Sequence, residues 1–124
     1  MLPFEIQLKH GTPVYEQVLY ASKKAIVSGQ LQPGEAFPSV RAISKELKVN
    51  PNTVQKAVTI LKQEGFLEVQ PGIGTIVAKS ARLNPEQRES LLEGELEGLA
   101  LKAKELSLSL DEVIKALRKH WKEL

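Results

Sequence analysis

The sequence predicts a mainly α-helical chain that contains one small β-hairpin, and three observations support this fold class. Hydrophobic residues recur at helical spacing in several segments that begin at capping residues or prolines. After Gly65 the hydrophobic period shortens from about 3.6 residues to about 2, which is typical of short strands. Beyond residue 83 the helical spacing returns. We therefore expect three helices, a hairpin and two further helices, in that order.

The composition indicates a small globular protein and excludes several classes of function. The 124 residues are 42% hydrophobic and 26% charged, which suits one domain with an appended helical piece. No apolar run approaches the roughly 18 residues of a membrane span, and residues 1–5 do not resemble a secretory signal. The chain has no cysteine, which excludes disulfides, cysteine-ligated zinc, iron–sulfur clusters and thiol catalysis and agrees with a cytoplasmic location.

The net charge of +2 is too small to indicate a nucleic-acid binder by itself. Residues 1–80 carry nine Lys and Arg against six Asp and Glu, a net charge of +3. Residues 81–124 carry eight against nine, a net charge of −1. The basic excess coincides with the helix-turn-helix pattern described below, but a difference of this size also lies within ordinary scatter.

The first helix is expected to follow an extended segment at residues 1–11. Thr12 suits the N-cap and Pro13 the first helical position, where its missing N–H costs nothing. Gly29 suits the end of this helix, and the two prolines and one glycine of residues 30–38 exclude a helix there. The apolar stripe expected to face the core consists of Val14, Val18, Ala21, Ala25 and Ile26.

A helix-turn-helix follows, because two helical patterns are separated by only the few residues around Val49. Ser39 suits the N-cap of the first of these helices. Asn50 and Pro51 suit the start of the second, which Gly65 ends. The buried side of the first is expected to consist of Val40, Ile43 and Leu47.

The second helix of this pair has two chemically different faces. Its apolar face consists of Val54, Ala57, Val58 and Leu61. Its polar face consists of Asn52, Gln55, Lys56 and Thr59. A short helix with one packed side and one side of amide, ammonium and hydroxyl groups suits the major groove of DNA. An ordinary solvated helix face has the same pattern, so the spacing alone does not decide between the two interpretations.

Two short strands are expected after this helix, joined by a glycine-rich connection at residues 71–74. Their residues are Phe66, Leu67, Val69 and then Thr75, Ile76 and Val77. A helix-turn-helix followed by such a hairpin makes a winged helix. We therefore assign residues 1–79 to a winged helix-turn-helix DNA-binding domain.

A second helical module is expected at residues 80–124. Asn84 and Pro85 suit the start of one helix, and Ser109 with Glu112 forms a capping-box sequence that starts another. Gly94 and Gly98 lower helix propensity, so each has a packing reason or marks a weak helix. The coiled-coil-type seam of the first helix consists of Leu92, Leu96, Leu99, Ala103 and Leu106. One side of the last helix presents Leu110, Val113, Ile114, Leu117 and Trp121.

Two helices of this length are too small to bury both apolar stripes. We therefore expect the module to be a dimerisation tail that pairs two chains about a two-fold axis. The residues assigned to the dimer interface are Leu92, Leu96, Leu99, Leu106, Leu117 and Trp121. In the alternative, the tail folds back onto Val14 and Val18 of the first helix.

Six stretches within residues 12–78 carry a family resemblance. They are residues 13–18 (PVYEQV), 29–34 (GQLQPG), 37–41 (FPSVR), 49–54 (VNPNTV), 61–65 (LKQEG) and 72–75 (GIGT). In this order and spacing they resemble the GntR family of bacterial transcription regulators, along the whole winged helix. By its length and pattern, the two-helix tail resembles the YtrA-like subfamily, whose members lack a large effector-binding domain.

The resemblance implies which residues meet DNA. They are Arg41, Asn52, Thr53, Gln55, Lys56, Gly72 and Gly74. Better-known branches of the family often place arginine at the positions of Pro51 and Gln55. Two strong guanine-binding side chains are therefore absent from this chain.

The chemistry of the implied helix residues suits contact with DNA. Arg41, in the first turn of its helix, can bind a phosphate or the O6 and N7 atoms of guanine. Asn52 and Thr53 lie where unpaired N–H groups and the positive end of the helix dipole attract phosphate. The side chain of Asn52 can also reach a base.

The remaining implied residues offer three kinds of contact. Gln55 can bond adenine in a bidentate manner, and Lys56 can bind a phosphate or guanine. Gly72 and Gly74 are needed for the turn of the hairpin. They also permit its tip to approach the DNA backbone closely, at the minor groove.

No pattern in the sequence indicates an enzyme, a metal site or a cofactor. His10 and His120 have no acidic or histidine companions at ligand spacing. No nucleophile is paired with a base, and no phosphate-binding loop of the Walker type is present. We therefore expect no catalytic residue, no metal and no cofactor.

The sequence favours a sequence-specific DNA-binding transcriptional regulator. Most simply, it is a repressor that binds an inverted-repeat operator as a homodimer and excludes polymerase. The alternative is a winged-helix protein–protein interaction module that does not bind DNA. The operator, the regulated genes, the choice between repression and activation, and the existence of a small-molecule effector stay open.

Overall fold

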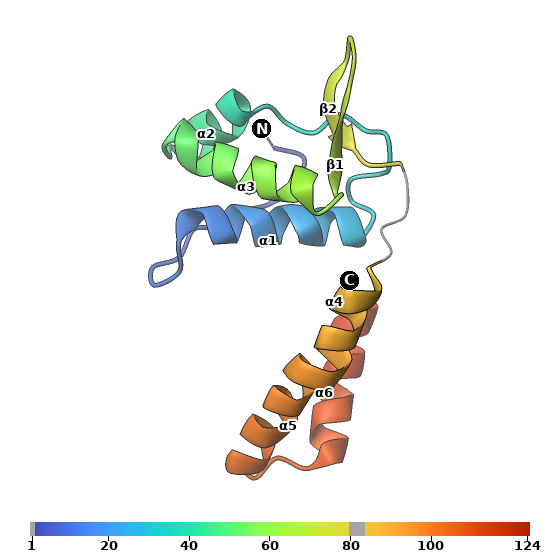
Figure 1. Ribbon diagram of the computed structural model, residues 1–124. Helices are drawn as coiled ribbons and strands as arrows, with labels where there is room; N and C mark the ends of the chain where they lie inside the picture. Colours follow the sequence, from blue (N-terminus) through green and yellow to red (C-terminus); the bar gives the residue numbers. More distant parts are fainter. Residues whose placement is uncertain (1, 80–83) are drawn as a thin grey trace. The chain divides into compact units, whose positions relative to one another are not determined.

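The computed structural model describes residues 2–79 and 84–124, and the chain divides into two compact units, Met1–Arg82 and Leu83–Leu124. The first unit contains α1 (Val14–Val27), α2 (Val40–Leu47), α3 (Pro51–Gln63) and an antiparallel hairpin of β1 (Leu67–Gln70) and β2 (Gly74–Val77). Figure 1 shows α1 and α3 side by side, with α2 near one end of α3 and the hairpin near the other. This is the winged helix-turn-helix that the sequence predicts.

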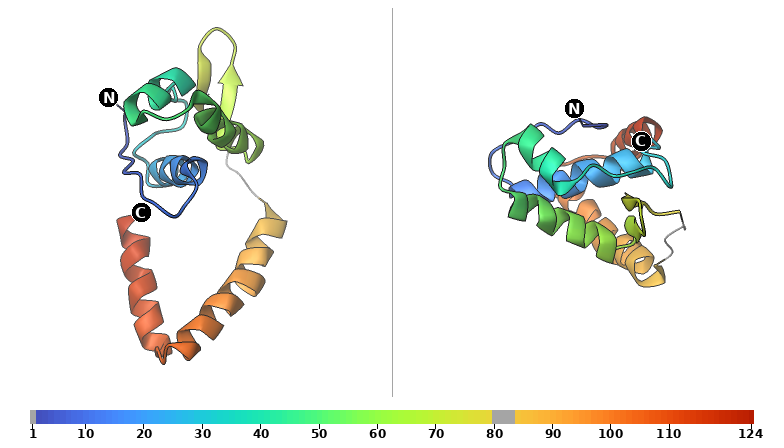
Figure 2. Two further views of the ribbon diagram at one scale, coloured as in Figure 1. Left: turned by 90° about the vertical axis from the view of Figure 1, so that its left-hand side faces the viewer. Right: turned by 90° about the horizontal axis from the view of Figure 1, so that it is seen from above.

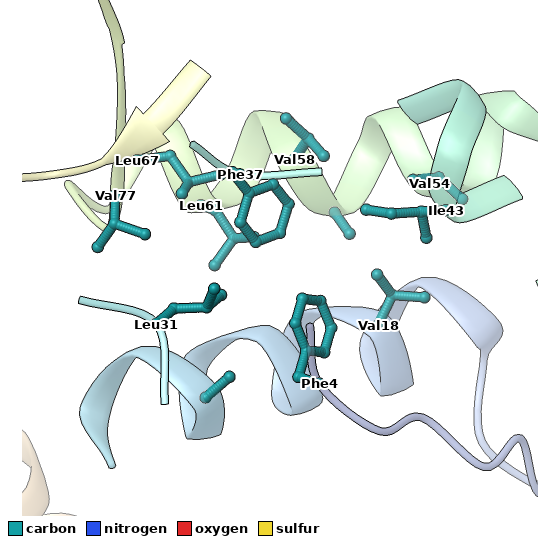
Figure 3. Packing of buried hydrophobic residues seen from close by; sticks show 12 residues of the cluster. Phe4, Val18, Leu31, Phe37, Ile43, Val54, Val58, Leu61, Leu67 and Val77 are labelled. Atoms are coloured by element: carbon teal, nitrogen blue, oxygen red, sulfur yellow. The ribbon is translucent and has the colours of Figure 1, made fainter. Parts of the chain in front are cut away.

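The core of the first unit lies between α1 on one side and α2, α3 and the hairpin on the other (Figure 3). Its members are Phe4, Val18, Ala25, Leu31, Phe37, Ile43, Val54, Ala57, Val58, Leu61, Leu67 and Val77. The rings of Phe4 and Phe37 stack with their centroids 5.9 Å apart. The extended N-terminal segment thus supplies a core aromatic, which its own sequence pattern does not indicate. Burying one such large side chain stabilises the fold by about 1.5–3 kcal/mol.

The start of α1 differs from its prediction. Pro13 occupies the N-cap without a side-chain capping bond, and Val14 is the first helical residue. The prediction that Thr12 caps this helix is therefore wrong. The carbonyl oxygen of Thr12 instead accepts a 2.8 Å hydrogen bond from Nε2 of Gln17. The same amide group bonds the backbone N–H and C=O of Lys9 at 2.8 and 2.9 Å, so Gln17 ties residues 9–12 to the helix in place of a cap.

The core-facing stripe of α1 includes a polar residue that the hydrophobic pattern missed. Val18 and Ala25 are buried as expected, and Val14, Ala21 and Ile26 are half-buried. Ser22 is fully buried beside them. Its hydroxyl donates a 2.7 Å hydrogen bond to the carbonyl of Val18, so its burial leaves no unpaired polar group.

The caps predicted for the helix-turn-helix are confirmed. Oγ of Ser39 accepts from the N–H of Ala42 at 3.0 Å, and Oδ1 of Asn50 accepts from the N–H of Asn52 at 2.8 Å. The turn between the helices depends on Lys48, whose φ of +57° is left-handed. This conformation lets α2 end at Leu47, one residue before Lys48, and lets α3 begin at Pro51, three residues after Lys48.

The hairpin pairs Leu67 with Val77 at its base and Gln70 with Gly74 near its tip. The connecting loop is therefore one residue shorter than predicted, since Gly74 belongs to β2. The N–H of Ile73 donates to the carbonyl of Gln70 at 3.0 Å, and Gly72 supplies the positive φ, +80°, that this turn requires.

The linker between α1 and α2 pairs with β2 and attaches the hairpin to the helices. The N–H groups of Gly34 and Phe37 donate to the carbonyls of Val77 and Thr75, both at 2.9 Å. The N–H of Val77 donates back to the carbonyl of Glu35 at 2.8 Å. The hairpin is thus held at its base by the core and the linker, while its tip projects from the helices (Figure 1).

The second unit consists of α4 (Pro85–Glu89), the π-helical segment η1 (Ser90–Glu95), α5 (Leu96–Glu105) and α6 (Leu110–Glu123). Asn84 caps the first helix through a 3.0 Å bond to the N–H of Gln87. Ser109 and Glu112 form the predicted capping box, with bonds of 3.1 and 2.9 Å. Figure 2 shows α4, η1 and α5 as one continuous arm that diverges from α6 beyond the turn between them.

The π-helical segment η1 lies within the predicted leucine seam. A π-helix has more residues per turn than the regular α-helix that the seam assumed. Leu91 and Leu92 lie in this segment, Leu96 begins α5, and all three side chains are exposed. Within residues 2–79 and 84–124, no helix combines the length and hydropathy needed to cross a membrane.

Candidate nucleic-acid interface

The two faces of α3 separate as the sequence predicts. Val54, Ala57 and Leu61 are fully buried, and Val58 is nearly so. The side chains that are exposed on α3 include those of Asn52, Gln55, Lys56 and Thr59. The buried face packs against α1 and α2. The polar face is therefore the side of α3 that an external partner can contact.

Two side chains of the polar face already contact each other. Nε2 of Gln55 donates to Oγ1 of Thr59 at 3.2 Å. A bidentate contact with adenine uses both the amide oxygen and the amide nitrogen, so base contact by Gln55 requires this exposed bond to open. An exposed hydrogen bond contributes little net free energy to stability, so replacing the Gln55–Thr59 bond with bonds to a base requires little free energy.

The N-terminus of α3 does not offer the unpaired N–H groups that its position suggests. Oδ1 of Asn50 accepts the N–H of Asn52, and the carbonyl of Asn50 accepts that of Thr53 at 3.0 Å. Pro51 has no N–H. The expectation of free donors there is therefore wrong, because the cap satisfies them. The helix dipole and the side chains of Asn52 and Thr53 remain available to attract a phosphate.

Arg41 lies in the first turn of α2, two residues after the capping Ser39. Its side chain is exposed. Within residues 2–79 and 84–124, no ion pair to an acidic side chain is recorded for it. A guanidinium that is not held by a carboxylate is free to bind an external anion or a base edge.

Lys56 is held by a residue that the sequence did not single out. Its Nζ lies 3.9 Å from the centroid of the Tyr15 ring, which belongs to α1. The two residues are far apart in the chain and meet because α1 packs against α3. No periodicity in the sequence indicates this pair, because it depends on how the two helices are rotated against each other.

The hairpin tip combines positive φ angles with open surroundings. Gly72 and Gly74 have φ values of +80° and +112°, and a Cβ added at either would meet no atom within 4 Å. Glycine is therefore required there by the turn and not by crowding within the described parts of the chain. Between them lies Ile73, which is 64% exposed and which sequence reasoning missed.

The second unit exposes an unusual amount of apolar surface. The six residues predicted to form a dimer interface are exposed by between 39% for Leu96 and 77% for Trp121. Further exposed leucines of the second unit include Leu91, Leu101, Leu108 and Leu110. Patches of this kind on a small unit are typical of a surface that another chain covers.

The described residues contain no group of three His, Asp or Glu side chains that could hold a metal ion. His10 lies in the first unit and His120 in the second, and both are exposed.

Comparison with known proteins identifies the fold's family. The sequence model of the bacterial regulatory proteins of the gntR family matches residues 14–77, from the first residue of α1 to the last of β2. The chain belongs to the GntR family. As a GntR protein it is a transcriptional regulator with a DNA-binding helix-turn-helix, and it is not an enzyme.

A curated GntR relative resembles the chain over both units. The HTH-type transcriptional repressor YtrA of Bacillus subtilis is 31% identical over 110 residues, which cover 88% of this chain and 85% of YtrA. The predicted YtrA-like character is therefore confirmed.

Two solved structures extend the comparison. A protein of Listeria monocytogenes EGD-e described as a transcriptional antiterminator has a TM-score of 0.81 at 30% identity, covering 94% of this chain and 88% of its own. The DNA-binding domain of AraR, solved in complex with operator ORX1, has a TM-score of 0.54 at 26% identity. The latter match covers 60% of this chain and 95% of that domain.

Proposed function

We propose that this GntR protein is a repressor that binds an inverted-repeat operator as a homodimer. The observation that carries the proposal is the exposed polar face of α3, which stands opposite a fully buried apolar face. A helix with this construction fits the major groove, where amide and cationic side chains bond to base edges and phosphates.

The roles of individual residues follow from their chemistry. Gln55 and Asn52 are proposed to contact bases, because amides pair with the donor and acceptor atoms of adenine. Thr53 and Lys56 are proposed to contact phosphates. Arg41 is proposed to contact a phosphate or a guanine.

The wing is proposed to supply the outer contacts of each half-site. Gly72 and Gly74 leave the hairpin tip without side chains at two positions, so the backbone there can approach a sugar-phosphate chain closely. The complex of the AraR domain with its operator supports the proposal that a domain of this fold meets duplex DNA.

The homodimer is proposed from the second unit. Its exposed interface residues are Leu92, Leu96, Leu99, Leu106, Leu117 and Trp121. A second copy that supplies the same stripes would remove this surface from water. Two-fold symmetry of the protein then requires an inverted-repeat operator with half-sites about 10–10.5 base pairs apart, or a multiple of this. We propose that an occupied operator excludes polymerase. The name of the Bacillus subtilis relative YtrA, an HTH-type transcriptional repressor, supports repression as the outcome.

Selection of bound duplexes from random DNA at physiological salt tests the proposal. We expect a recovered inverted repeat and an affinity whose logarithm falls linearly with the logarithm of salt concentration, since several phosphates are neutralised. Recovery of no sequence together with a flat salt response would contradict it. A pull-down that captures a protein partner but no DNA would then favour the protein–protein interaction module.

A further inference from the structure

Of the four side chains on the polar face of α3, that of Lys56 alone carries a charge. The residue is exposed, yet its ammonium group has a defined position. Nζ lies 3.9 Å from the centroid of the Tyr15 ring, well inside the distance of about 6 Å at which a ring face attracts a cation.

Tyr15 is suited to act as a fixed platform. It lies in the first turn of α1 and is half-buried, and α1 packs along α3. Its hydroxyl faces Glu16, with 3.3 Å between Oη and Oε1. Because the hydroxyl has this partner, the face of the ring is the part of Tyr15 that contacts Lys56.

The pair determines which part of a duplex the ammonium group can meet. When α3 lies in the major groove, its flanks face the phosphate chains that border the groove. Tyr15 draws the ammonium away from the midline of α3 towards α1. A ring on one side of an ammonium group leaves donors on the other side open to a phosphate oxygen.

We infer that Tyr15 is a positioning residue for DNA binding, whose ring holds the Lys56 ammonium ready for a backbone phosphate and not for a base. The inference rests on the proposed function. Holding a flexible lysine in place before binding lowers the rotamer entropy lost in the complex.

A double-mutant cycle on a mixed-sequence duplex that spans two half-sites tests the inference. The proteins are the wild type, Tyr15→Leu, Lys56→Gln and the double variant, with Tyr15→Phe as the matched control. We expect Tyr15→Leu to weaken binding about two- to fivefold, the effect of one exposed cation–π contact. Lys56→Gln should lower the salt slope by about 0.9 per chain, the value for one lost phosphate contact.

The coupling between the two residues is the decisive result. In the Lys56→Gln background, Tyr15→Leu should not weaken duplex binding any further, and Tyr15→Phe alone should bind like the wild type. An equal loss from Tyr15→Leu in both backgrounds would overturn the inference, since the ring would then act without Lys56. A loss from Tyr15→Phe as large as that from Tyr15→Leu would also overturn it, since the hydroxyl would then be the contact.

A measurement on the wild type guards against variants that fail to fold. The ε-methylene protons of Lys56 should resonate upfield of those of other lysines, because they lie over a ring face. Ordinary lysine shifts would overturn the inference while leaving duplex binding intact. If the wild type binds no duplex at low salt, the proposed function fails, and this inference fails with it.

Discussion

Single side chains on the proposed DNA surface differ in whether they already have partners. Gln55 is bonded to Thr59, and Lys56 lies on the Tyr15 ring. For Arg41, no ion pair to an acidic side chain is recorded within residues 2–79 and 84–124. Arg41 therefore exchanges fewer protein contacts on binding than Gln55 or Lys56, and its substitution should affect DNA affinity with little effect on folding.

Arg41→Ala should weaken operator binding by about 1–3 kcal/mol if the guanidinium pairs with guanine. If it binds a phosphate instead, the loss should be uniform across sequences and the salt slope should fall by about 0.9 per chain. Fluorescence anisotropy over a range of salt separates the two results. Lys24→Ala, an exposed cation in the last turn of α1, is the control and should bind like the wild type. Wild-type affinity of Arg41→Ala for every duplex would contradict the assignment.

At the scale of elements, the helix-turn-helix depends on one strained residue. Lys48 adopts φ +57° at the end of α2, and Val49 then donates its N–H to the carbonyl of Ser44 at 3.1 Å. A left-handed backbone costs an L residue about 1–2 kcal/mol, whereas glycine adopts it freely. With lysine at position 48, the turn between α2 and α3 is therefore less stable than it would be with glycine there.

Lys48→Gly should raise the free energy of unfolding by about 0.5–1 kcal/mol, because relief of the left-handed strain exceeds the added chain entropy. Lys45→Gly is the matched control within α2. It should lower that free energy by about 1 kcal/mol, because Lys45 lies in regular helix. Chemical denaturation measures both. A loss of stability in Lys48→Gly would show that the lysine side chain itself stabilises the turn.

Gly98 of the second unit offers a test of how the arm formed by α4, η1 and α5 is packed. Gly98 lies within α5, and a Cβ built on it meets no atom within 4 Å. In a regular α-helix it also lies opposite the leucine seam. Neither packing within the described residues nor the proposed dimer therefore requires glycine at this position.

Gly98→Ala should stabilise the protein by about 0.8–1 kcal/mol through helix propensity, without changing its mass in solution. Gly29→Ala is the contrasting control. Its φ of +83° makes any side chain there strained, so stability should fall. Thermal unfolding with a mass measurement checks both variants. Dissociation of Gly98→Ala would show instead that a partner helix packs against Gly98.

For the whole molecule, the two units differ in how they bury apolar surface. Within residues 2–79, the first unit has a closed core of twelve residues, which includes Phe4 near one end and Val77 near the other. Among the residues described in the second unit, Ala103 is the buried hydrophobic residue. The second unit therefore depends on a further surface for its stability, and the proposed dimer supplies one.

Leu117→Glu should convert the dimer to a monomer, because it places a charge in the proposed apolar interface without disturbing a core contact. Sedimentation equilibrium at micromolar concentration measures the mass. Affinity for an inverted repeat should fall, while binding to a single half-site persists. Val27→Glu, at an exposed apolar residue of α1, is the control and should stay dimeric. A monomeric wild type would contradict the proposed dimer.

The sequence by itself determined the helices, their caps at Ser39, Asn50 and Ser109, the two faces of α3, and the family. These features depend on residues within a few positions of one another, where spacing and capping chemistry act directly. The exact boundaries of two segments depended on other contacts. The start of α1 and the length of the hairpin loop shifted by one residue, because Gln17 and the pairing of Gly74 decide them.

Only the tertiary structure decided the contacts that join distant parts of the chain. It placed Phe4 against Phe37, paired the α1–α2 linker with β2, and set the Lys56 ammonium over the Tyr15 ring. Each depends on the rotation and separation of elements that pack together, and no spacing along the sequence encodes those quantities. The chemical groups available for DNA contact therefore follow from the sequence, whereas their positions before binding follow from the packing of α1 against α3.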